Sequence, residues 1–260
     1  MASDGTAGMS EKNEITAAVL VIGDEILSGR TKDKNIGYIA EHLTRIGIQA
    51  REVRVVPDVE AEIVGALNTL RARYDYVFTT GGIGPTHDDV TTDAIAAAFG
   101  VEAPIDERAV EAMRQGFREL TDARLRMARI PQGAELIDNP ISRAPGFMIG
   151  NVVVMAGIPR IMQVMLDAVA PKLRKGRTML SCSVRIDVPE GDVAPGLSAL
   201  QSEHPQVQIG SYPFFDKGRV GTFIVLRSID VGRLEAAERG LWELVTCQGF
   251  KAETAEKAKA

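Results

Sequence analysis

A run of glycines followed by two aspartates is the part of the sequence whose residue types are best suited to chemistry. The stretch from Tyr76 to Val90 reads YVFTTGGIGPTHDDV. Gly81, Gly82 and Gly84 tolerate positive φ angles and let backbone N–H groups approach a ligand with no side chain in the way. A helix that begins after such a loop adds partial positive charge, which favours an anion such as phosphate. The glycines alone leave two interpretations open, a phosphate site or only a tight turn.

The two aspartates after the glycines favour the first interpretation. Asp88 and Asp89 come where the next helix is expected to begin, and a carboxylate there can cap free N–H groups. Capping accounts for one aspartate, but not for two, with Asp93 one turn later on the predicted helix face of Asp89. Next to a phosphate, carboxylate oxygens suit Mg²⁺, which bridges both anions and removes their repulsion. Asp88 is then either a second metal ligand or a cap.

Two further predicted strands end in acidic residues. The segment GDEILSG begins at Gly23 and places Asp24 and Glu25 after the first strand, and VVPD places Asp58 after the second. Asp24 alone would be interpreted as the cap of a polar turn. Because the carboxyl ends of parallel strands meet at one edge of a sheet, acids after three successive strands indicate a site there. Glu25 and His87 are candidates to accept a proton from water, although a loop histidine is commonly a capping or solvent-facing group.

Strands and helices alternate along the first part of the chain, which predicts right-handed crossovers and a parallel sheet. The expected strands are Ile15–Gly23, Ile48–Val56 and Tyr74–Thr80, and the expected helices are Asn35–Gly47, 59–70 and Asp89–Gly100.

Further elements are expected after this alternation. Helical patterning over Asp106–Arg129 precedes a hairpin-like MIGNVVVMAG and a closing helix over Pro159–Leu173. The Arg-rich run at its end is typical of a solvated helix face, with the alternative that Arg126 or Arg129 reaches a phosphate. After residue 175 the order β-α-β-β-α predicts a small α+β domain. We expect domains over 15–175 and 176–250, with disordered ends at 1–14 and 251–260.

Composition narrows the class of protein. The chain has 260 residues, 45% of them hydrophobic and 25% charged, and a net charge of −5, which argues against nucleic acid as a partner. No segment has the roughly 20 apolar residues that span a membrane, and the N-terminal residues lack the apolar core of a secretory signal. Cys182 and Cys247 form no CxxC motif, so neither a zinc site nor a disulfide is expected. A cytoplasmic protein fits best.

Several segments together resemble the MoaB/Mog-type molybdopterin-binding domain. They are GDEILSG, VVPD, TTGGIGPTHDDVTTDA, IPQGAELIDNPISRAPGF and AGIP, in this order between Gly23 and Pro159. The similarity is closer to the competence/damage-inducible protein A family and to the N-terminal domain of eukaryotic FAD synthase. QIGSYPFF is similar to the KH-like or ferredoxin-like domain that follows in the damage-inducible branch. The resemblance implies an α/β fold: a three-layer α/β/α sandwich with a mostly parallel sheet, then a small α+β domain.

The resemblance also implies site residues. Asp89 and Asp58 would be the functional acids, to which we add His87 as a catalytic candidate. The predicted metal ligands are Asp24, Asp88 and Asp89. The predicted ligand-binding residues are Gly23, Glu25, Thr80, Gly81, Gly82, Gly84, Asn139, Ala144, Pro145, Gly146, Gly157 and Pro159. The chain departs from the family pattern at Asp88, where Mog-type proteins usually carry a basic residue, and at Ser142, where relatives often have glycine.

Two classes of function follow. The first is an enzyme that hydrolyses a nucleotide pyrophosphate, of the ADP-ribose or FAD type, with Mg²⁺, Mn²⁺ or Co²⁺. The alternative is a protein that binds molybdopterin or a nucleotide, either adenylating molybdopterin or without turnover. The chain is too short for the C-terminal amidase domain of the damage-inducible proteins, so deamidase activity is not expected. Expected partners are a small nucleotide or pterin and further copies of the chain, with no nucleic acid and no membrane.

Overall fold

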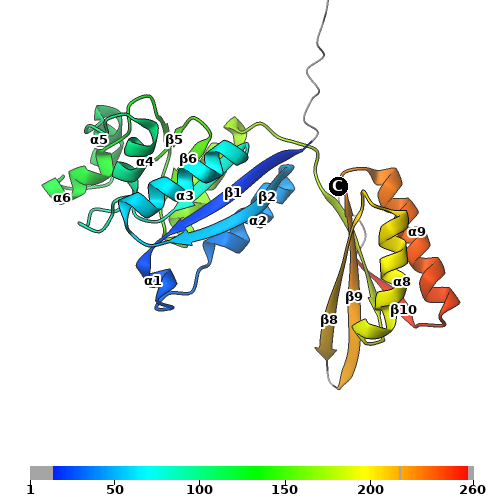
Figure 1. Cartoon of the computed structure of the whole chain (residues 1–260). Coiled ribbons are helices and arrows are strands. Elements are labelled where there is room, and N and C mark those ends of the chain that lie inside the picture. Colours follow the sequence, from blue (N-terminus) through cyan, green and yellow to red (C-terminus); the bar gives the residue numbers. More distant parts are fainter. Residues whose placement is uncertain (1–13, 217, 257–260) are drawn as a thin grey trace, which may run out of the picture. The chain divides into compact units, whose positions relative to one another are not determined.

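The computed structural model describes residues 14–216 and 218–256. The expected N-terminal extension therefore lies outside the described residues except for Glu14, as do residues 257–260 of the expected tail. The chain divides into two compact units, residues 1–176 and 177–260, and Figure 1 shows both units. None of the helices within the described ranges combines the length and apolar character needed to cross a bilayer.

The first unit is built on a six-stranded mixed sheet with the strand order β2-β1-β3-β6-β5-β4. Strands β2, β1, β3 and β6 pair in parallel, and the expected hairpin of β5 and β6 adds an antiparallel edge that β4 extends. The mostly parallel sheet is thus confirmed. Its strands are β1 (Ile15–Ile22), β2 (Ile48–Val56), β3 (Tyr76–Thr80), β4 (Glu135–Ile137), β5 (Gly146–Ile149) and β6 (Val152–Met155).

Helices cover both faces of this sheet, because both faces of its central strands are apolar. In β1, Leu20 and Ile22 face one core together with α3 (Glu60–Arg73), α4 (Thr91–Phe99) and α5 (Glu107–Arg114). Val19 and Val21 face the opposite core with α2 (Asn35–Arg45) and α7 (Pro159–Val169). Buried strands of this kind read as continuous apolar runs, and the predicted three-layer sandwich is confirmed. The short elements are α1 (Asp24–Leu27), α6 (Asp122–Leu125), η1 (Arg126–Ala128) and η2 (Ala170–Lys172).

The long helix expected over Asp106–Arg129 does not form. Helix α5 ends at Arg114, and the chain resumes helical geometry at α6, where the Thr121 hydroxyl accepts a hydrogen bond from the Arg124 N–H over 3.4 Å. Gly116 lies in the break, and glycine has a low helix propensity. The Arg-rich pattern therefore belongs to two short helical pieces and not to one solvated helix face.

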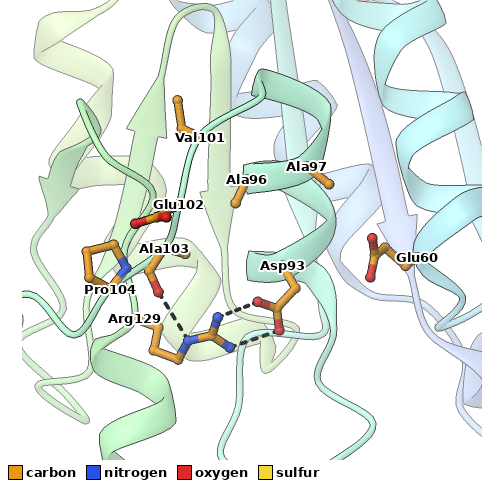
Figure 2. A pocket seen from close by; sticks show the side chains of 9 residues that line it. All are labelled: Glu60, Asp93, Ala96, Ala97, Val101, Glu102, Ala103, Pro104 and Arg129. Carbon is orange, nitrogen blue, oxygen red and sulfur yellow. Dashed lines mark hydrogen bonds and ion pairs between the residues drawn. The ribbon is translucent and has the colours of Figure 1, made fainter.

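The helix after the glycine loop also differs from expectation. Helix α4 begins at Thr91, with Val90 as its N-cap and no capping side chain, so Asp88 and Asp89 lie in the preceding loop. Asp93 does not share a site with Asp89; its Oδ1 accepts from Arg129 Nη2 at 2.5 Å and its Oδ2 from Nη1 at 2.9 Å. Figure 2 shows this pair, with Arg129 Nε also donating to the Ala103 carbonyl. The cavity that they line is separate from the glycine loop and measures about 520 Å³. Arg129 is therefore a structural ion-pair partner, and the alternative that it reaches a phosphate is not supported.

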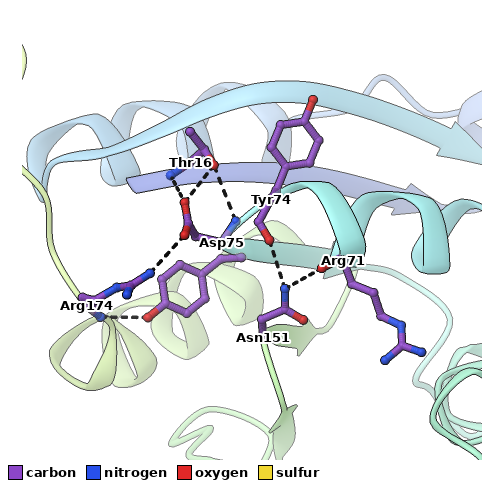
Figure 3. A network of polar contacts seen from close by, with 7 residues as sticks. Thr16, Arg71, Tyr74, Asp75, Asn151 and Arg174 are labelled. Atoms are coloured by element: carbon purple, nitrogen blue, oxygen red, sulfur yellow. Dashed lines mark hydrogen bonds and ion pairs between the residues drawn. The ribbon is translucent and has the colours of Figure 1, made fainter. Parts of the chain in front are cut away.

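Polar contacts tie down the amino-terminal end of β1 and β3, at the edge of the sheet away from the glycine loop (Figure 3). The backbone N–H and the hydroxyl of Thr16 both donate to Asp75 Oδ2 at 2.9 Å. Arg174 donates to Asp75 Oδ1 at 3.0 Å and, through its backbone N–H, to the Tyr76 hydroxyl at 2.9 Å. Asn151 Nδ2 donates to the carbonyl groups that end α3. These bonds anchor the chain that leaves the first unit.

The second unit is a four-stranded antiparallel sheet with the order β10-β7-β9-β8 and two helices packed on it. Its elements are β7 (Leu180–Ile186), α8 (Glu190–Glu203), β8 (Gln208–Asp216), β9 (Arg219–Ser228), α9 (Val231–Cys247) and β10 (Ala252–Glu256). The predicted α+β domain is confirmed, and its βαββαβ order is that of a ferredoxin-like unit. The prediction of a disordered tail is wrong for residues 252–256. They pair with β7 from Ala252↔Ile186 onwards, because an edge strand of the sheet offers free N–H and C=O groups to the returning chain.

A buried histidine makes stability depend on pH. His42 on α2 is 9% exposed, and burial lowers the pKa of its imidazole below the ordinary 6.5, although Asp167 acts in the opposite direction. Since the folded pKa is the lower one, the unfolded chain takes up the proton first as the pH falls. The free energy of unfolding should therefore decrease as the pH drops through about 6.5.

We expect His42→Gln to flatten this dependence between about pH 7.5 and pH 5.5, where an ordinary histidine titrates. Urea unfolding at several pH values measures the slope, with His87→Gln on an exposed loop as the control. An unchanged slope in His42→Gln would show that other groups carry the dependence.

Candidate functional site

A cavity of about 510 Å³ lies at the carboxyl ends of β1, β3 and β6, the edge at which open α/β sheets bind ligands. Its size is within the range of small-molecule sites. Predicted site residues that follow these three strand ends line it, together with residues between β4 and β5. They are Glu25, Gly81, Gly82, Gly84, Asp89, Asn139, Ala144, Pro145, Gly157 and Pro159.

The glycine loop forms the floor of this cavity and has no room for side chains. Gly81 has φ 109°, and a Cβ atom there would overlap the carbonyl oxygen of Ile22. The next strand end is equally close, because a Cβ on Gly157 would lie 3.3 Å from the Cα of Gly81. Backbone therefore faces the cavity at this point, which is the arrangement that lets N–H groups approach an anion.

Asp89 is the acidic group that the glycine loop itself positions. The backbone N–H of Thr86 donates to Asp89 Oδ2 at 2.9 Å, and the Thr86 hydroxyl donates to the same oxygen. A Cβ on Gly84 would lie 2.6 Å from Oδ2 and 3.0 Å from Oδ1, so the carboxylate packs directly over a glycine. Asp89 thus closes the loop onto itself and lines the cavity, in place of capping α4.

Asp58 lies next to the cavity and is held by the end of β1. Its Oδ2 accepts the backbone N–H of Asp24 at 2.9 Å. Burial raises the pKa of Asp58 above its usual range, and the charges of Asp24, Glu25 and Asp88 act in the same direction, while the Asp24 hydrogen bond opposes them. A carboxyl group with a raised pKa is a better proton acceptor than an ordinary one.

The remaining predicted residues do not line the cavity. Gly23 follows β1, Gly146 begins β5, and both are buried. Thr80, the last residue of β3, is buried next to the glycine loop. Asp24, His87 and Asp88 are exposed, and none of the three contributes to the cavity wall. Their assigned roles remain predictions.

A divalent metal fits this site only in part. Within residues 14–216 and 218–256, no three or more His, Cys, Asp or Glu side chains are grouped so as to hold a metal ion. Asp24, Asp88 and Asp89 therefore do not form a ready-made three-residue metal cluster. Mg²⁺, however, is commonly held by one or two carboxylates together with the phosphates of a substrate. Asp89 and Glu25, both in the cavity wall, suit that second mode.

Asn139 lines the cavity, and its side chain also holds a turn in place. Its side-chain Nδ2 donates to the Ala144 carbonyl at 2.8 Å and to Ser142 Oγ at 2.5 Å. Its Oδ1 accepts the backbone N–H groups of Ile141 and Ser142 at 3.2 and 3.3 Å. The amide lines the cavity, but its hydrogen bonds shape the turn over 139–144, so its contribution is to hold that turn in place.

Asn35 is a residue that the sequence analysis missed. At the start of α2 and only 5% exposed, it donates through Nδ2 to Thr80 Oγ1 and to the Gly157 carbonyl, both at 2.8 Å. Thr80 in turn donates to the Ala156 carbonyl at 3.0 Å. Asn35 therefore links the strand ends that carry the cavity floor. An asparagine at a helix start is an ordinary sequence feature, so the pattern held no signal for this role.

The apolar wall of the cavity was also missed. Residues from four separate segments supply it, namely Ile83, Phe117, Met127, Ile158, Ile161 and Met165. Phe117 comes from the break between α5 and α6, which was expected to be helix. The backbone of the glycine loop and these apolar side chains therefore line the same cavity, a combination that suits a ligand with a flat ring system as well as a polar group.

Comparisons with known proteins agree with this division of the chain. Residues 18–175 match the family "Probable molybdopterin binding domain", and residues 178–253 match "FAD synthase, middle domain". A protein of Pyrobaculum calidifontis is 36% identical over 211 residues, which cover 76% of this chain and 80% of that protein. A "Probable FAD synthase" of Caenorhabditis briggsae is 29% identical over 258 residues, covering 88% of this chain and 49% of that protein. The crystal structure of the protein CinA from Thermoplasma acidophilum, described as of unknown function, matches with a TM-score of 0.58 and 37% identity over 62% of this chain and 98% of that one.

We expect Asn35→Asp to destabilise the first unit by roughly 2–4 kcal/mol near neutral pH, because a carboxylate would replace a donor that faces the Gly157 carbonyl. The loss should shrink near pH 4, where a protonated carboxyl can donate again. Denaturant unfolding measures both values. Asn68→Asp, on the exposed face of α3, is the matched control and should change stability by less than about 0.5 kcal/mol. Equal effects of the two substitutions would remove Asn35 from the framework of the site.

Proposed function

The chain belongs to the "Probable molybdopterin binding domain" family, and from that premise we propose that its cavity binds a phosphate-bearing nucleotide and hydrolyses the pyrophosphate linkage. The family match and the similarity to the CinA structure confirm the resemblance to the MoaB/Mog-type domain and to CinA. One observation carries the proposal: a side-chain-free glycine floor and the carboxylate of Asp89 face the same cavity. The match of residues 178–253 to the middle domain of FAD synthase supports a dinucleotide such as FAD or ADP-ribose as substrate.

The glycine loop on the floor of the cavity would bind the pyrophosphate. Backbone N–H groups of the loop that contains Gly81 and Gly84 would donate to phosphate oxygens with no side chain between them. The apolar wall with Phe117 and Met127 would pack against the ring of the nucleotide. This arrangement would place the phosphates beside Asp89 and Glu25, which both line the cavity.

Hydrolysis then requires a proton acceptor for the attacking water. The oxygen of water forms a bond to one phosphorus, the bridging P–O bond breaks, and the proton of the water passes to a carboxylate. Asp58 is the first candidate because burial raises the pKa of its carboxyl, and Glu25 in the cavity wall is the second. His87 is a weaker candidate because it lies exposed on the loop, whereas Asp58 is partly buried. Products from ADP-ribose would be AMP and ribose 5-phosphate, and those from FAD would be AMP and FMN.

A divalent ion bound to Asp89 would neutralise the phosphate charge and polarise the phosphoryl oxygen. Asp89 suits this task because Thr86 occupies only its Oδ2. Mg²⁺, Mn²⁺ and Co²⁺ are the candidates, since each accepts carboxylate and phosphate oxygens.

A second function rests on the same cavity. The apolar wall is equally suited to a pterin ring, and the family description names molybdopterin. In that case the chain would bind molybdopterin or transfer an adenylate to it, with no hydrolysis of free dinucleotides.

We expect wild-type protein with Mg²⁺, Mn²⁺ or Co²⁺ to release AMP from ADP-ribose or FAD, and Asp89→Asn to lose this turnover at least about 100-fold. The melting temperature of Asp89→Asn should stay close to that of the wild type, because asparagine still accepts the Thr86 hydrogen bonds and the change is about 1 kcal/mol or less.

Product release by chromatography is the measurement, and Asp192→Asn on α8 of the second unit controls for the change in net charge. Full activity in Asp89→Asn would exclude Asp89 from the mechanism. Absence of AMP with every substrate and metal, together with binding of molybdopterin, would favour the second function.

A further inference from the structure

Arg143 holds an unusual backbone conformation beside the cavity. It has φ 64°, and among the residues that the structure describes it is the one non-glycine residue with a positive φ. A side chain in this left-handed region costs free energy, and such residues persist where the surroundings enforce them, often at functional sites. The residues on either side of it, Ser142 and Ala144, both line the cavity.

The hydrogen bonds of Asn139 enforce this conformation. The backbone N–H of Arg143 donates to the Asn139 carbonyl at 2.9 Å, while the Asn139 side chain bonds to Ser142 before it and to Ala144 after it. The chain therefore wraps around one amide group, and Arg143 takes the left-handed position in the turn. Asparagine or glycine would occupy that position with less strain.

A second feature makes room for the arginine side chain itself. A Cβ atom on Gly116 would lie 2.6 Å from Arg143 Cγ and 3.0 Å from its Cβ. Gly116 directly precedes Phe117, which belongs to the apolar wall of the cavity. The side chain of Arg143 thus packs against Gly116, and the segments that carry these two residues both continue into the cavity wall.

The charges around the cavity suggest a role for the Arg143 guanidinium. Among the described residues, the cavity wall contains the acids Glu25 and Asp89 and no lysine or arginine, although the proposed ligand is anionic. Arg143 is partly buried, and its guanidinium makes no hydrogen bond or ion pair with any residue in the ranges 14–216 and 218–256. We propose that Arg143 is an anion-binding residue at the mouth of the cavity, where its guanidinium contacts a phosphate oxygen of the ligand next to the phosphate on the glycine loop.

This inference rests on the proposed function and specifies it. A guanidinium offers two parallel N–H donors to a phosphate, so Arg143 would favour ligands with a pyrophosphate over those with a single phosphate or none. It would therefore determine specificity without taking part in the proton transfer.

The test compares ligand binding with stability in three variants of the full chain. Arg143→Gly and Arg143→Asn remove the positive charge and suit the left-handed backbone conformation. Arg143→Lys keeps the charge but lacks the two parallel N–H donors of the guanidinium. Calorimetry measures the binding of inorganic pyrophosphate, ADP-ribose and adenosine, and thermal unfolding is followed in parallel. Arg114→Gln, which removes an exposed cation paired with Glu111 on α5, is the control for net charge.

We expect Arg143→Gly and Arg143→Asn to weaken pyrophosphate and ADP-ribose binding by about tenfold or more, as for loss of a charge-assisted hydrogen bond. Adenosine affinity should be unchanged, Arg143→Lys should be intermediate, and the unfolding temperature of Arg143→Gly should equal or exceed that of the wild type because strain is relieved. Arg114→Gln should bind all three compounds as the wild type does.

Different failures have different meanings. If the wild type binds pyrophosphate and Arg143→Gly binds it equally well, the inference is overturned while the proposed function stands. If Arg143→Gly is less stable and binds normally, Arg143 has only a structural role. If the wild type binds neither pyrophosphate nor ADP-ribose, both proposals fail.

Discussion

The close approach of three strand ends is the constraint on which the site depends. Where β1, β3 and β6 finish, the backbone of Gly81 lies against the Ile22 carbonyl on one side and against Gly157 on the other. Any side chain between them would push the strands apart and open the parallel pairing that continues below. Asn35 adds the hydrogen bonds that hold the last two of these strand ends together. The same packing that closes the sheet therefore leaves bare backbone facing the cavity, so the floor to which we assign anion binding is a consequence of the fold.

Charge around this floor creates a problem that the fold does not solve by itself. Glu25 and Asp89 are in the cavity wall, and burial together with the charges of Asp24, Glu25 and Asp88 raises the pKa of the nearby Asp58 carboxyl. A phosphate brought into such surroundings is repelled at short range, where screening by salt is weak. The backbone N–H groups offset part of that repulsion, and a bound cation or a nearby arginine must offset the rest. If the proposed function holds, such a site would bind its anion together with positive charge, which would link ligand binding to metal binding.

Much of this architecture could be predicted from the sequence, for reasons that differ between elements. The apolar runs of β1 and β3 and the helical spacing in α2 report burial directly, and the glycines after β3 report the absence of space for a side chain. Asp93 shows where such reasoning fails: its helical spacing from Asp89 suggested a shared site, but its partner Arg129 lies 36 residues along the chain. Long-range pairing of this kind leaves no local pattern. The prediction of a helix over Phe117 was wrong for a different reason: the surrounding residues favoured a helix, but the chain breaks around Gly116.

The glycine floor and the apolar wall of the cavity respond differently to substitution because they are built from different parts of the chain. The glycine floor is backbone, so its shape is set by glycines and by buried amides such as Asn35 and Asn139, and a substitution there disturbs the strand ends themselves. The apolar wall includes the side chains of Phe117, Met127 and Met165. Phe117 comes from an irregular segment and Met127 from a single 3₁₀ turn. Those two can be replaced without moving the sheet, since loops and short helical turns tolerate change better than strands. In the proposed function, the ability to hold a phosphate would therefore depend on the sheet, whereas part of the selectivity between a nucleobase, a flavin and a pterin would depend on the segment between α5 and β4.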